Sequence, residues 1–201
     1  MDLEKLEDSI NRSTNVNRAL GVSFALFLFY LSINVASTTD LILFLPDSKI
    51  ILPILNIELP LKAFYIAAPF LLIMFHYNLL IHLQIHCKKL NRWKENKNVK
   101  PRDSRNLNPF LLNYLTFNLN KYHQLGIVIL TRLTVFTLPL ALLISIQIRF
   151  SDYQSWSFTI WHFLCVIFDL FLITRYSDEI RKYTKFSTIS IKLFKQYIFF
   201  K

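Results

Sequence analysis

Four long apolar runs with almost no charge constrain this chain more than any other feature of its sequence. They cover residues 19–37, 63–85, 125–148 and 156–174. An apolar run of about 20 residues is long enough for a helix to cross a hydrocarbon layer of roughly 30 Å. The 201 residues are 53% hydrophobic and include 19 Phe, more than a soluble core of this size needs to bury. We therefore predict an all-α membrane protein with four transmembrane helices in one domain, residues 19–175.

The basic residues indicate how the chain is oriented. The N-terminal segment 1–18, the loop 88–124 and the stretch after the fourth span hold 19 of the 23 Lys and Arg residues. Cytoplasmic loops carry such an excess, so both termini are expected in the cytosol. The net charge of +10 then needs no nucleic acid to explain it. Segment 1–18 carries four acids against three bases, unlike the basic start of a cleaved signal peptide.

The segment between the first two spans, residues 38–62, reads TTDLILFLPDSKIILPILNIELPLK. Pro46, Asp47 and Ser48 are turn residues between two apolar runs, and further prolines exclude a continuous helix. We predict a short extracytoplasmic hairpin or re-entrant flap, with Pro60 opening the second span. Pro69 in span two and Pro139 in span three are expected to kink their helices.

Residues 30–86 resemble a membrane module that precedes pentapeptide repeats in a group of bacterial proteins. The similarity lies in the order of ASTTD, a short apolar loop, PILNIELP and FYIAAP. Asn56, Glu58, Pro60 and Pro69 are the positions that match. The resemblance covers about a quarter of the chain, and no pentapeptide repeats follow residue 175.

A second resemblance rests on length, number of spans and the basic cytosolic face, without a motif. In these respects the chain is similar to the small multi-span accessory proteins of type VI-B CRISPR systems. One kind of these carries an Arg-x4-6-His nuclease-like signature, which this sequence lacks. The resemblance therefore implies a defence-associated accessory protein without nuclease activity.

Two charged residues fall inside predicted spans. Arg132 and Asp169 each lie six to seven residues from the cytosolic end of adjacent antiparallel spans, at about 10 Å depth. Because a lone charge in hydrocarbon costs about 3 kcal/mol, we expect them to form an intramembrane ion pair. This pair could clamp the two helices together or belong to a proton or ion pathway. Alternatively, Arg132 snorkels without a partner.

Span two contains a set of polar residues, namely His76, Asn78, His82 and His86. These side chains could hydrogen bond between helices or line a water-filled path in an oligomer. His82 and His86 share a helix face and could supply two corners of a metal site, but Cys87 points elsewhere and a closed zinc site needs four ligands. No metal or other cofactor is therefore expected.

The cytosolic segments are basic and partly amphipathic. Residues 108–124 are expected to form an interfacial helix with Asn108 as N-cap and Pro109 at the first helical position. The tail 176–201 is basic and amphipathic, and its end, 186–201, would rest on the membrane or dock a partner. The basic patch of the loop is formed by Lys88, Lys89, Arg92, Lys94, Lys97, Lys100, Arg102 and Arg105. Anionic lipid headgroups, RNA or an acidic protein could bind it.

The sequence also argues against several classes of function. Two glycines, Gly21 and Gly126, cannot build a phosphate-binding loop, and two cysteines cannot build a disulfide framework. No spacing of Ser, His and Asp indicates a hydrolase, so we expect no enzyme. With the two resemblances, the leading hypothesis is a defence-associated accessory or effector protein of the bacterial inner membrane, acting as a homo-oligomer in the lipid bilayer that perturbs or gates permeability. The alternative is a membrane anchor that recruits a cytosolic protein or ribonucleoprotein through the basic loop and tail.

Overall fold

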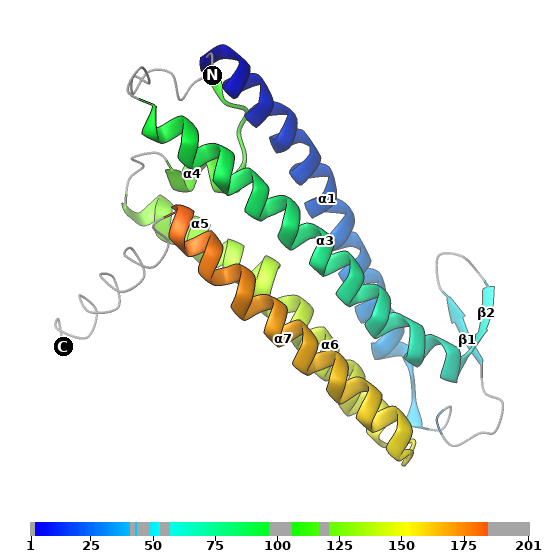
Figure 1. The fold of residues 1–201 in the computed structure, drawn as a ribbon. Helices are drawn as coiled ribbons and strands as arrows, with labels where there is room; N and C mark the ends of the chain where they lie inside the picture. Colours follow the sequence, from blue (N-terminus) through cyan, green and yellow to red (C-terminus); the bar gives the residue numbers. More distant parts are fainter. Residues whose placement is uncertain are drawn as a thin grey trace. The chain divides into compact units, whose positions relative to one another are not determined.

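The computed structural model describes residues 3–40, 43, 49–52, 57–96, 106–116 and 121–184. It contains four helical stretches long and apolar enough to cross a membrane. They are α1 (Leu3–Ser37), α3 (Leu61–Glu95), the stretch Leu125–Ser151, and Trp156–Ser177 at the start of α7 (Trp156–Thr184). The third runs through α5 (Lys121–Thr131), the π-helix η2 (Arg132–Thr137) and α6 (Leu138–Ser151). These helices indicate a multi-pass membrane protein, as the apolar runs predicted (Figure 1).

The helices extend well beyond the predicted spans. α1 begins at Leu3 instead of residue 19, and α3 continues to Glu95, so the start of the predicted loop 88–124 is helical. α7 likewise continues to Thr184, into the predicted tail 176–201. Hydropathy reports only the part of a helix that suits hydrocarbon, whereas polar residues with good helix propensity continue the same helix.

The chain divides into two compact units, which we describe separately. Unit 1 comprises residues 1–22, 79–135 and 174–201, and unit 2 comprises residues 23–78 and 136–173. Each of the long helices α1, α3 and α7 contributes residues to both.

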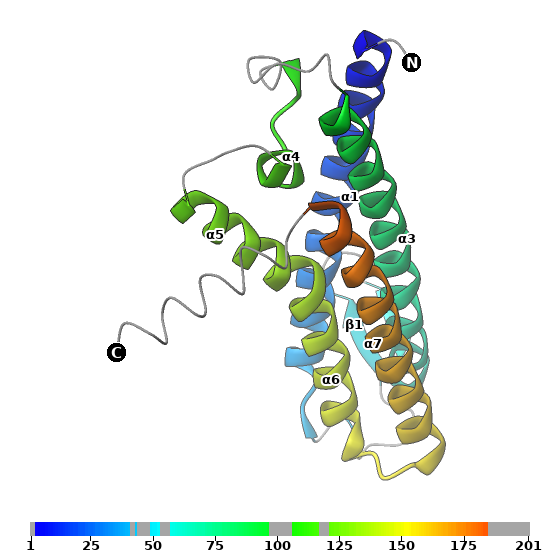
Figure 2. The same cartoon turned by 60° about the vertical axis from the view of Figure 1, so that its left-hand side comes forward.

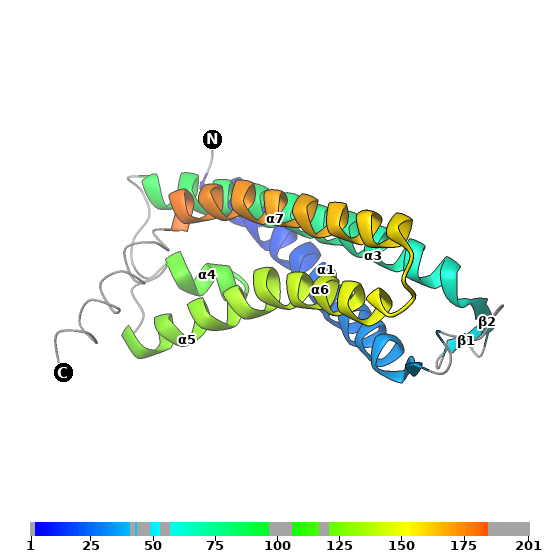
Figure 3. The same cartoon turned by 90° about the horizontal axis from the view of Figure 1, so that it is seen from below.

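Unit 2 has a core of buried stripes that repeat every three or four residues, the spacing of one helix face. On α1 the stripe is Phe24, Leu28, Leu31 and Val35; on α3 it is Leu61, Tyr65, Ala68 and Leu72; on α6 it is Leu142, Ile146 and Phe150; on α7 it includes Cys165 and Leu172. Large apolar side chains such as Phe29, Phe70 and Phe171 are exposed on the opposite faces. Within this unit, α7 lies beside α3 (Figure 3). An apolar exterior around such a core suits a lipid environment.

A β-hairpin precedes α3. Strand β1 (Lys49–Leu52) pairs antiparallel with β2 (Ile57–Pro60), with Lys49 opposite Pro60 and Leu52 opposite Ile57. A hairpin or re-entrant flap was predicted here with its turn at residues 46–48, but the two paired strands are connected by residues 53–56. α3 begins at Leu61 directly after Pro60, as predicted. The predicted turn at residues 46–48 lies outside the described residues.

The third apolar helix contains an irregular segment. The π-helical turn η2 ends immediately before Leu138, and Pro139 occupies the start of α6. Proline cannot donate to the carbonyl four residues earlier, and π-helical turns are recognised places where helices bend. The irregularity therefore falls just before Pro139. A short turn then joins α6 to α7, with Gln154 in the left-handed region at φ 55° (Figure 2).

The predicted interfacial helix 108–124 is wrong in its boundaries. The helix α4 runs only from Leu111 to Thr116, and residues 108–110 are not helical. Asn108 is therefore not the N-cap of a helix starting at Pro109. Asn108 makes tertiary and side-chain contacts instead: its backbone N–H donates to Asn11 Oδ1 of α1 at 2.8 Å, and its carbonyl accepts from Asn113 Nδ2 at 2.8 Å.

Candidate functional site

A fully buried histidine and carboxylate meet inside unit 2. His76 Nδ1 of α3 lies 2.6 Å from Asp169 Oδ1 of α7, and the two side chains are 0% and 1% exposed. We call this pair the interhelical dyad. His76 continues the α3 stripe through Leu72, and Asp169 lies between Cys165 and Leu172 in the α7 stripe. Helix periodicity thus directs both polar groups into the core, where they must satisfy each other.

An aromatic ring packs against one face of the dyad histidine. The Phe24 ring of α1 stacks on the His76 imidazole with centroids 5.5 Å apart, and Phe75 packs edge-on against Phe24. The second carboxylate oxygen, Asp169 Oδ2, is buried and has no hydrogen-bond partner among the described residues. A ring nitrogen and a carboxyl oxygen this close need one proton between them, because both atoms otherwise present lone pairs.

A second buried histidine, His162, supplies the hydrogen-bond donor that Pro69 cannot supply within α3. Pro69 has no N–H, so the carbonyl of Tyr65, four residues earlier in α3, loses its helical donor. His162 Nε2 of α7 lies 2.8 Å from that oxygen, and His162 is 1% exposed. Because a carbonyl can only accept, Nε2 carries the proton. Trp161 Nε1 donates to the next carbonyl, of Ile66, at 3.2 Å. Neighbouring helices satisfy freed backbone groups in this way in membranes.

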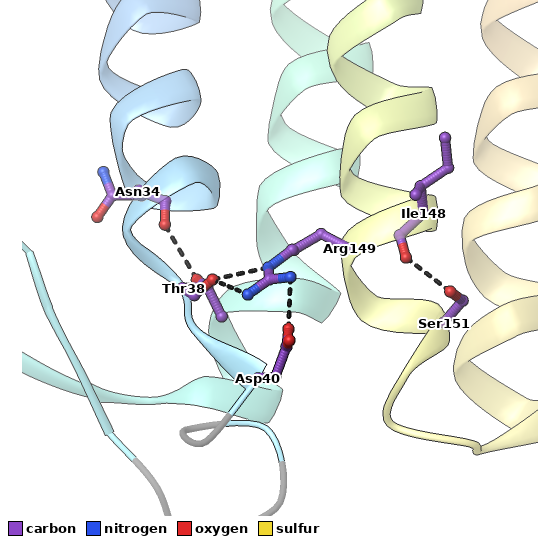
Figure 4. A network of polar contacts seen from close by, with 6 residues as sticks. All are labelled: Asn34, Thr38, Asp40, Ile148, Arg149 and Ser151. Carbon is purple, nitrogen blue, oxygen red and sulfur yellow. Dashed lines mark hydrogen bonds and ion pairs between the residues drawn. The ribbon is translucent and has the colours of Figure 1, made fainter.

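Arg149 ties α6 to the end of α1. Its Nε donates to the Thr38 carbonyl at 2.7 Å, its Nη2 donates to the same oxygen, and its Nη1 pairs with Asp40 at 2.7 Å (Figure 4). Thr38 Oγ1 in turn donates to the Asn34 carbonyl at 3.0 Å. The last carbonyls of a helix have no internal donor, and the guanidinium supplies one here.

In unit 1 the first half of α1 carries a row of polar side chains along one face. Glu7, Asn11, Thr14, Asn15 and Arg18 repeat with near-helical spacing. Their side chains hydrogen bond to the segment 106–113, which follows α3 in the chain. Glu7 accepts from Asn106 Nδ2 at 3.2 Å, Asn11 Nδ2 donates to the Asn106 carbonyl at 2.9 Å, and Arg18 donates to the Pro109 carbonyl at 2.6 Å.

His86 on α3 completes this assembly. Its Nε2 lies 2.7 Å from Asn113 Oδ1, and its Nδ1 lies 3.1 Å from Ser13 Oγ. The Asn113 amide nitrogen donates to the Asn108 carbonyl at 2.8 Å and to Thr14 Oγ1 at 3.2 Å, so its oxygen must face His86. His86 Nε2 is then the protonated nitrogen.

Trp93 at the end of α3 also belongs to the assembly, because its Nε1 donates to Glu7 Oε1 at 3.1 Å. We call the set formed by α1 residues 7–18, the segment 106–113, His86 and Trp93 the polar platform. These parts are far apart in the sequence, and the hydrogen bonds named above join α1, α3 and the segment 106–113 to one another.

The four polar residues predicted in span two, which we call the polar stripe, differ in burial and in contacts. His76 and His86 are fully buried in their own units and hydrogen bond to other elements, which favours the first of their two predicted roles. Asn78 is exposed and His82 is half-buried. The described residues contain no cluster of three or more His, Cys, Asp or Glu that could hold a metal ion.

The predicted partner of Asp169 was Arg132, whereas the structure gives it His76. Arg132 is half-buried at the start of η2 and belongs to unit 1, so its pairing with Asp169 stays a prediction. Of the positions matching the bacterial module, Glu58 forms an exposed ion pair with Lys49 at 2.8 Å, Pro60 ends β2 and Pro69 lies inside α3. Asn56 lies outside the described residues.

The described part of the basic patch lies on the last turns of α3. Lys88, Arg92 and Lys94 are exposed, and Lys89 is half-buried with its Nζ donating to the Ser9 carbonyl at 3.3 Å. Lys97, Lys100, Arg102 and Arg105 lie outside the described residues, as does the predicted docking tail 186–201.

Neither the polar platform nor the hydrogen bond from His162 to the Tyr65 carbonyl was predicted, although the sequence contains a feature that points to each. Residues 7, 11, 14, 15 and 18 mark one helix face, and a proline inside an apolar helix requires a donor from elsewhere. Comparison of the chain with protein-family models, curated proteins and solved structures finds no match.

Proposed function

We propose that the chain is a non-enzymatic bacterial inner-membrane protein that anchors an acidic cytosolic partner, a protein or a ribonucleoprotein, at the membrane. The observation that carries this proposal is the polar platform. Side chains of α1 about one helical turn apart hold the segment 106–113, and His86 and Trp93 tie the same structure to α3. A binding surface gains precision when it is supported by such rigid elements.

The charge of the surrounding surface supports an acidic partner. Lys88, Arg92 and Lys94 are exposed on the last two turns of α3, the same helix that supplies His86 and Trp93. On α1, Arg12 is exposed but already pairs with Asp8 at 2.7 Å. Basic side chains on a fixed surface attract an acidic partner and set its orientation. The positive-inside distribution favours a cytosolic location for this surface.

The resemblance to CRISPR accessory proteins supplies a class of partner. If it holds, the acidic partner is a ribonucleoprotein and the protein serves antiviral defence. An effector complex presents exposed RNA phosphates, which basic side chains bind with a strong dependence on salt.

A homo-oligomer that perturbs or gates permeability is the second candidate function. The exposed apolar side chains of α7, including Phe163, Phe168 and Phe171, favour it, because they offer a surface to neighbouring subunits as well as to lipid. Against it, His76 and His86 make their contacts within one chain, which leaves Asn78 and His82 as the pore-lining candidates of the stripe.

The anchor proposal is tested with the full chain in nanodiscs of neutral lipid. The probes are a fluorescent single-stranded RNA and a fluorescent polyglutamate. We expect salt-dependent binding of at least one probe, and roughly tenfold weaker binding after Arg92→Glu with Lys94→Glu. The matched control, Lys49→Glu with Lys62→Glu, reverses two charges far from the platform in the sequence and should leave binding unchanged. Equal binding by both double variants would overturn the proposal.

The permeability function has its own assay. Reconstituted protein should release a trapped dye from liposomes, and release should fall when Asn78 and His82 are both replaced by Leu. Vesicles that stay tight at every protein density would remove this candidate and leave the anchor proposal untouched.

A further inference from the structure

An open groove lies between α1 and α6 at the hairpin end of unit 2. Its volume is about 840 Å³, within the roughly 300–1,000 Å³ typical of small-molecule sites. Apolar side chains, including Val35, Leu142 and Ile148, line part of it. Its polar lining consists mainly of Arg149, Asp40, Asp152 and the three serines Ser32, Ser145 and Ser151. Figure 4 shows its charged end, where Arg149 reaches Thr38 and Asp40.

The serines offer the groove hydrogen-bond acceptors. Ser32 donates its hydroxyl proton to the Leu28 carbonyl at 2.8 Å, Ser145 donates to Ala141 at 2.8 Å, and Ser151 donates to Ile148 at 2.6 Å. A hydroxyl has a single proton and two lone pairs, so each serine oxygen can only accept from a ligand. With the carboxylates of Asp40 and Asp152, the lining is rich in acceptors and suits a ligand that carries N–H donors.

Arg149 supplies the complementary charge. A guanidinium has five N–H groups, and the contacts to Thr38 and Asp40 use three of them. Two N–H groups remain without a partner among the described residues, and the side chain is 28% exposed. One cation beside two carboxylates matches a zwitterion, with an anionic group on Arg149 and an ammonium on the aspartates.

The length of the groove indicates what else the ligand contains. From Leu142 to Asp152 the lining follows α6 for ten residues, or about 15 Å. This equals one leaflet of a hydrocarbon core of roughly 30 Å. A transmembrane helix of a partner would need a contact surface about twice as long, whereas one acyl chain fits within a single leaflet.

We propose that this groove binds one phospholipid with a primary amine headgroup, of the phosphatidylethanolamine class. The three N–H groups of the ammonium donate to Asp40, Asp152 and Ser151, and the phosphate accepts from the two remaining N–H groups of Arg149. An acyl chain lies between α1 and α6 against Val35, Leu142 and Ile148. This function is separate from partner anchoring, which rests on unit 1.

The test measures lipid retention by native mass spectrometry on the full chain released from nanodiscs. The probes are phosphatidylethanolamine, its trimethylated analogue phosphatidylcholine, and phosphatidylglycerol of the same acyl chains. A trimethylammonium has no N–H, so we expect phosphatidylethanolamine to be retained about tenfold better than phosphatidylcholine. Phosphatidylglycerol, which lacks the cation, should also be retained less well. Equal retention of the three lipids would overturn the proposal.

The position of the lipid site is tested by a substitution that places a larger side chain in the groove. Ser145 is exposed and hydrogen bonds only to its own helix, so Ser145→Leu should fold normally and reduce retention of phosphatidylethanolamine about tenfold. The matched control is Ser157→Leu on the exposed face of α7, outside the groove, which should retain the lipid fully. Undiminished retention by Ser145→Leu would overturn the proposed site. Free phosphoethanolamine should not displace the lipid, and full displacement by it would overturn the role of the acyl chain.

Discussion

At the scale of single residues, the buried polar groups of unit 2 satisfy requirements that neighbouring helices create. His76 and Asp169 satisfy each other, and His162 satisfies the carbonyl that Pro69 leaves open. Inside hydrocarbon no water can take either role, so each residue constrains the identity of its partner. Double-mutant experiments can therefore measure both contacts.

The interhelical dyad should be more sensitive to losing one member than to losing both. Asp169→Leu removes the partner of His76 Nδ1 in the core and should lower the free energy of unfolding by about 1–3 kcal/mol. Adding His76→Leu should recover part of that loss, because the buried imidazole that lost its carboxylate partner is then removed as well. Denaturant unfolding in detergent micelles measures both. Asp8→Leu, at an exposed carboxylate, should stay within about 0.5 kcal/mol of the parent.

The link between Pro69 and His162 predicts a specific coupling. His162→Phe leaves the Tyr65 carbonyl without a donor and should cost about 1–2 kcal/mol of unfolding free energy. In a Pro69→Ala background the new N–H of residue 69 can donate to that carbonyl, so the same substitution should cost clearly less. The same micelle assay gives the four free energies of the cycle. Additive costs would mean that His162 does not replace the missing helical bond.

At the scale of elements, four spans were predictable because an apolar run of the right length has few other folds available. The helix ends were not, since α1 and α3 continue through polar residues that hydropathy does not score. A hairpin was predicted from prolines and turn residues, but with its turn at residues 46–48, whereas residues 53–56 connect the paired strands. The placement of Pro60 directly before α3 was correct. The interfacial helix was wrong in its start, where Asn108 contacts Asn11 across about a hundred residues, a tertiary contact that no local pattern encodes.

The hairpin contains an ion pair whose titration can be followed. The hydrogen bond from Lys49, and then its charge, lowers the pKa of Glu58, and the same contact raises the pKa of Lys49. The contribution of Glu58 to hairpin order is therefore present above its unfolded pKa and lost as the pH falls through the lowered value. The contribution of Lys49 is present below its unfolded pKa and lost as the pH rises through the raised value.

This behaviour is measured by NMR titration of the Glu58 carboxyl carbon. Lys49→Gln should return the pKa of Glu58 upward to the usual range. The control Lys62→Gln removes a nearby lysine that lies over the Tyr153 ring, 5.5 Å from its centroid, and should leave the Glu58 titration unchanged. Both side chains of the pair are exposed, so added salt should weaken the effect.

At the scale of the whole molecule, the sequence predicted that polar residues in the spans form a site, but it did not predict which residues contact each other. Polar residues in spans were recognised as important, and Asp169 was expected to need a partner. The choice of His76 depends on which faces of α3 and α7 meet, which packing decides after the spans have formed. The polar platform lies outside the apolar runs, where hydropathy gives no information.

The membrane topology is the prediction on which the anchor proposal depends. The positive-inside distribution predicts that Asn96, just after α3, lies in the cytosol and that Lys49 in the hairpin lies outside. Single cysteines, Asn96→Cys and Lys49→Cys, are introduced after both native cysteines are replaced by Ala; the native thiols are buried and free. In intact spheroplasts a membrane-impermeant maleimide should label Lys49→Cys at once and Asn96→Cys only after permeabilisation. Labelling of both cysteines from outside would mean that α3 does not separate these positions across the membrane. It would place the polar platform outside the cytosol and exclude a cytosolic partner.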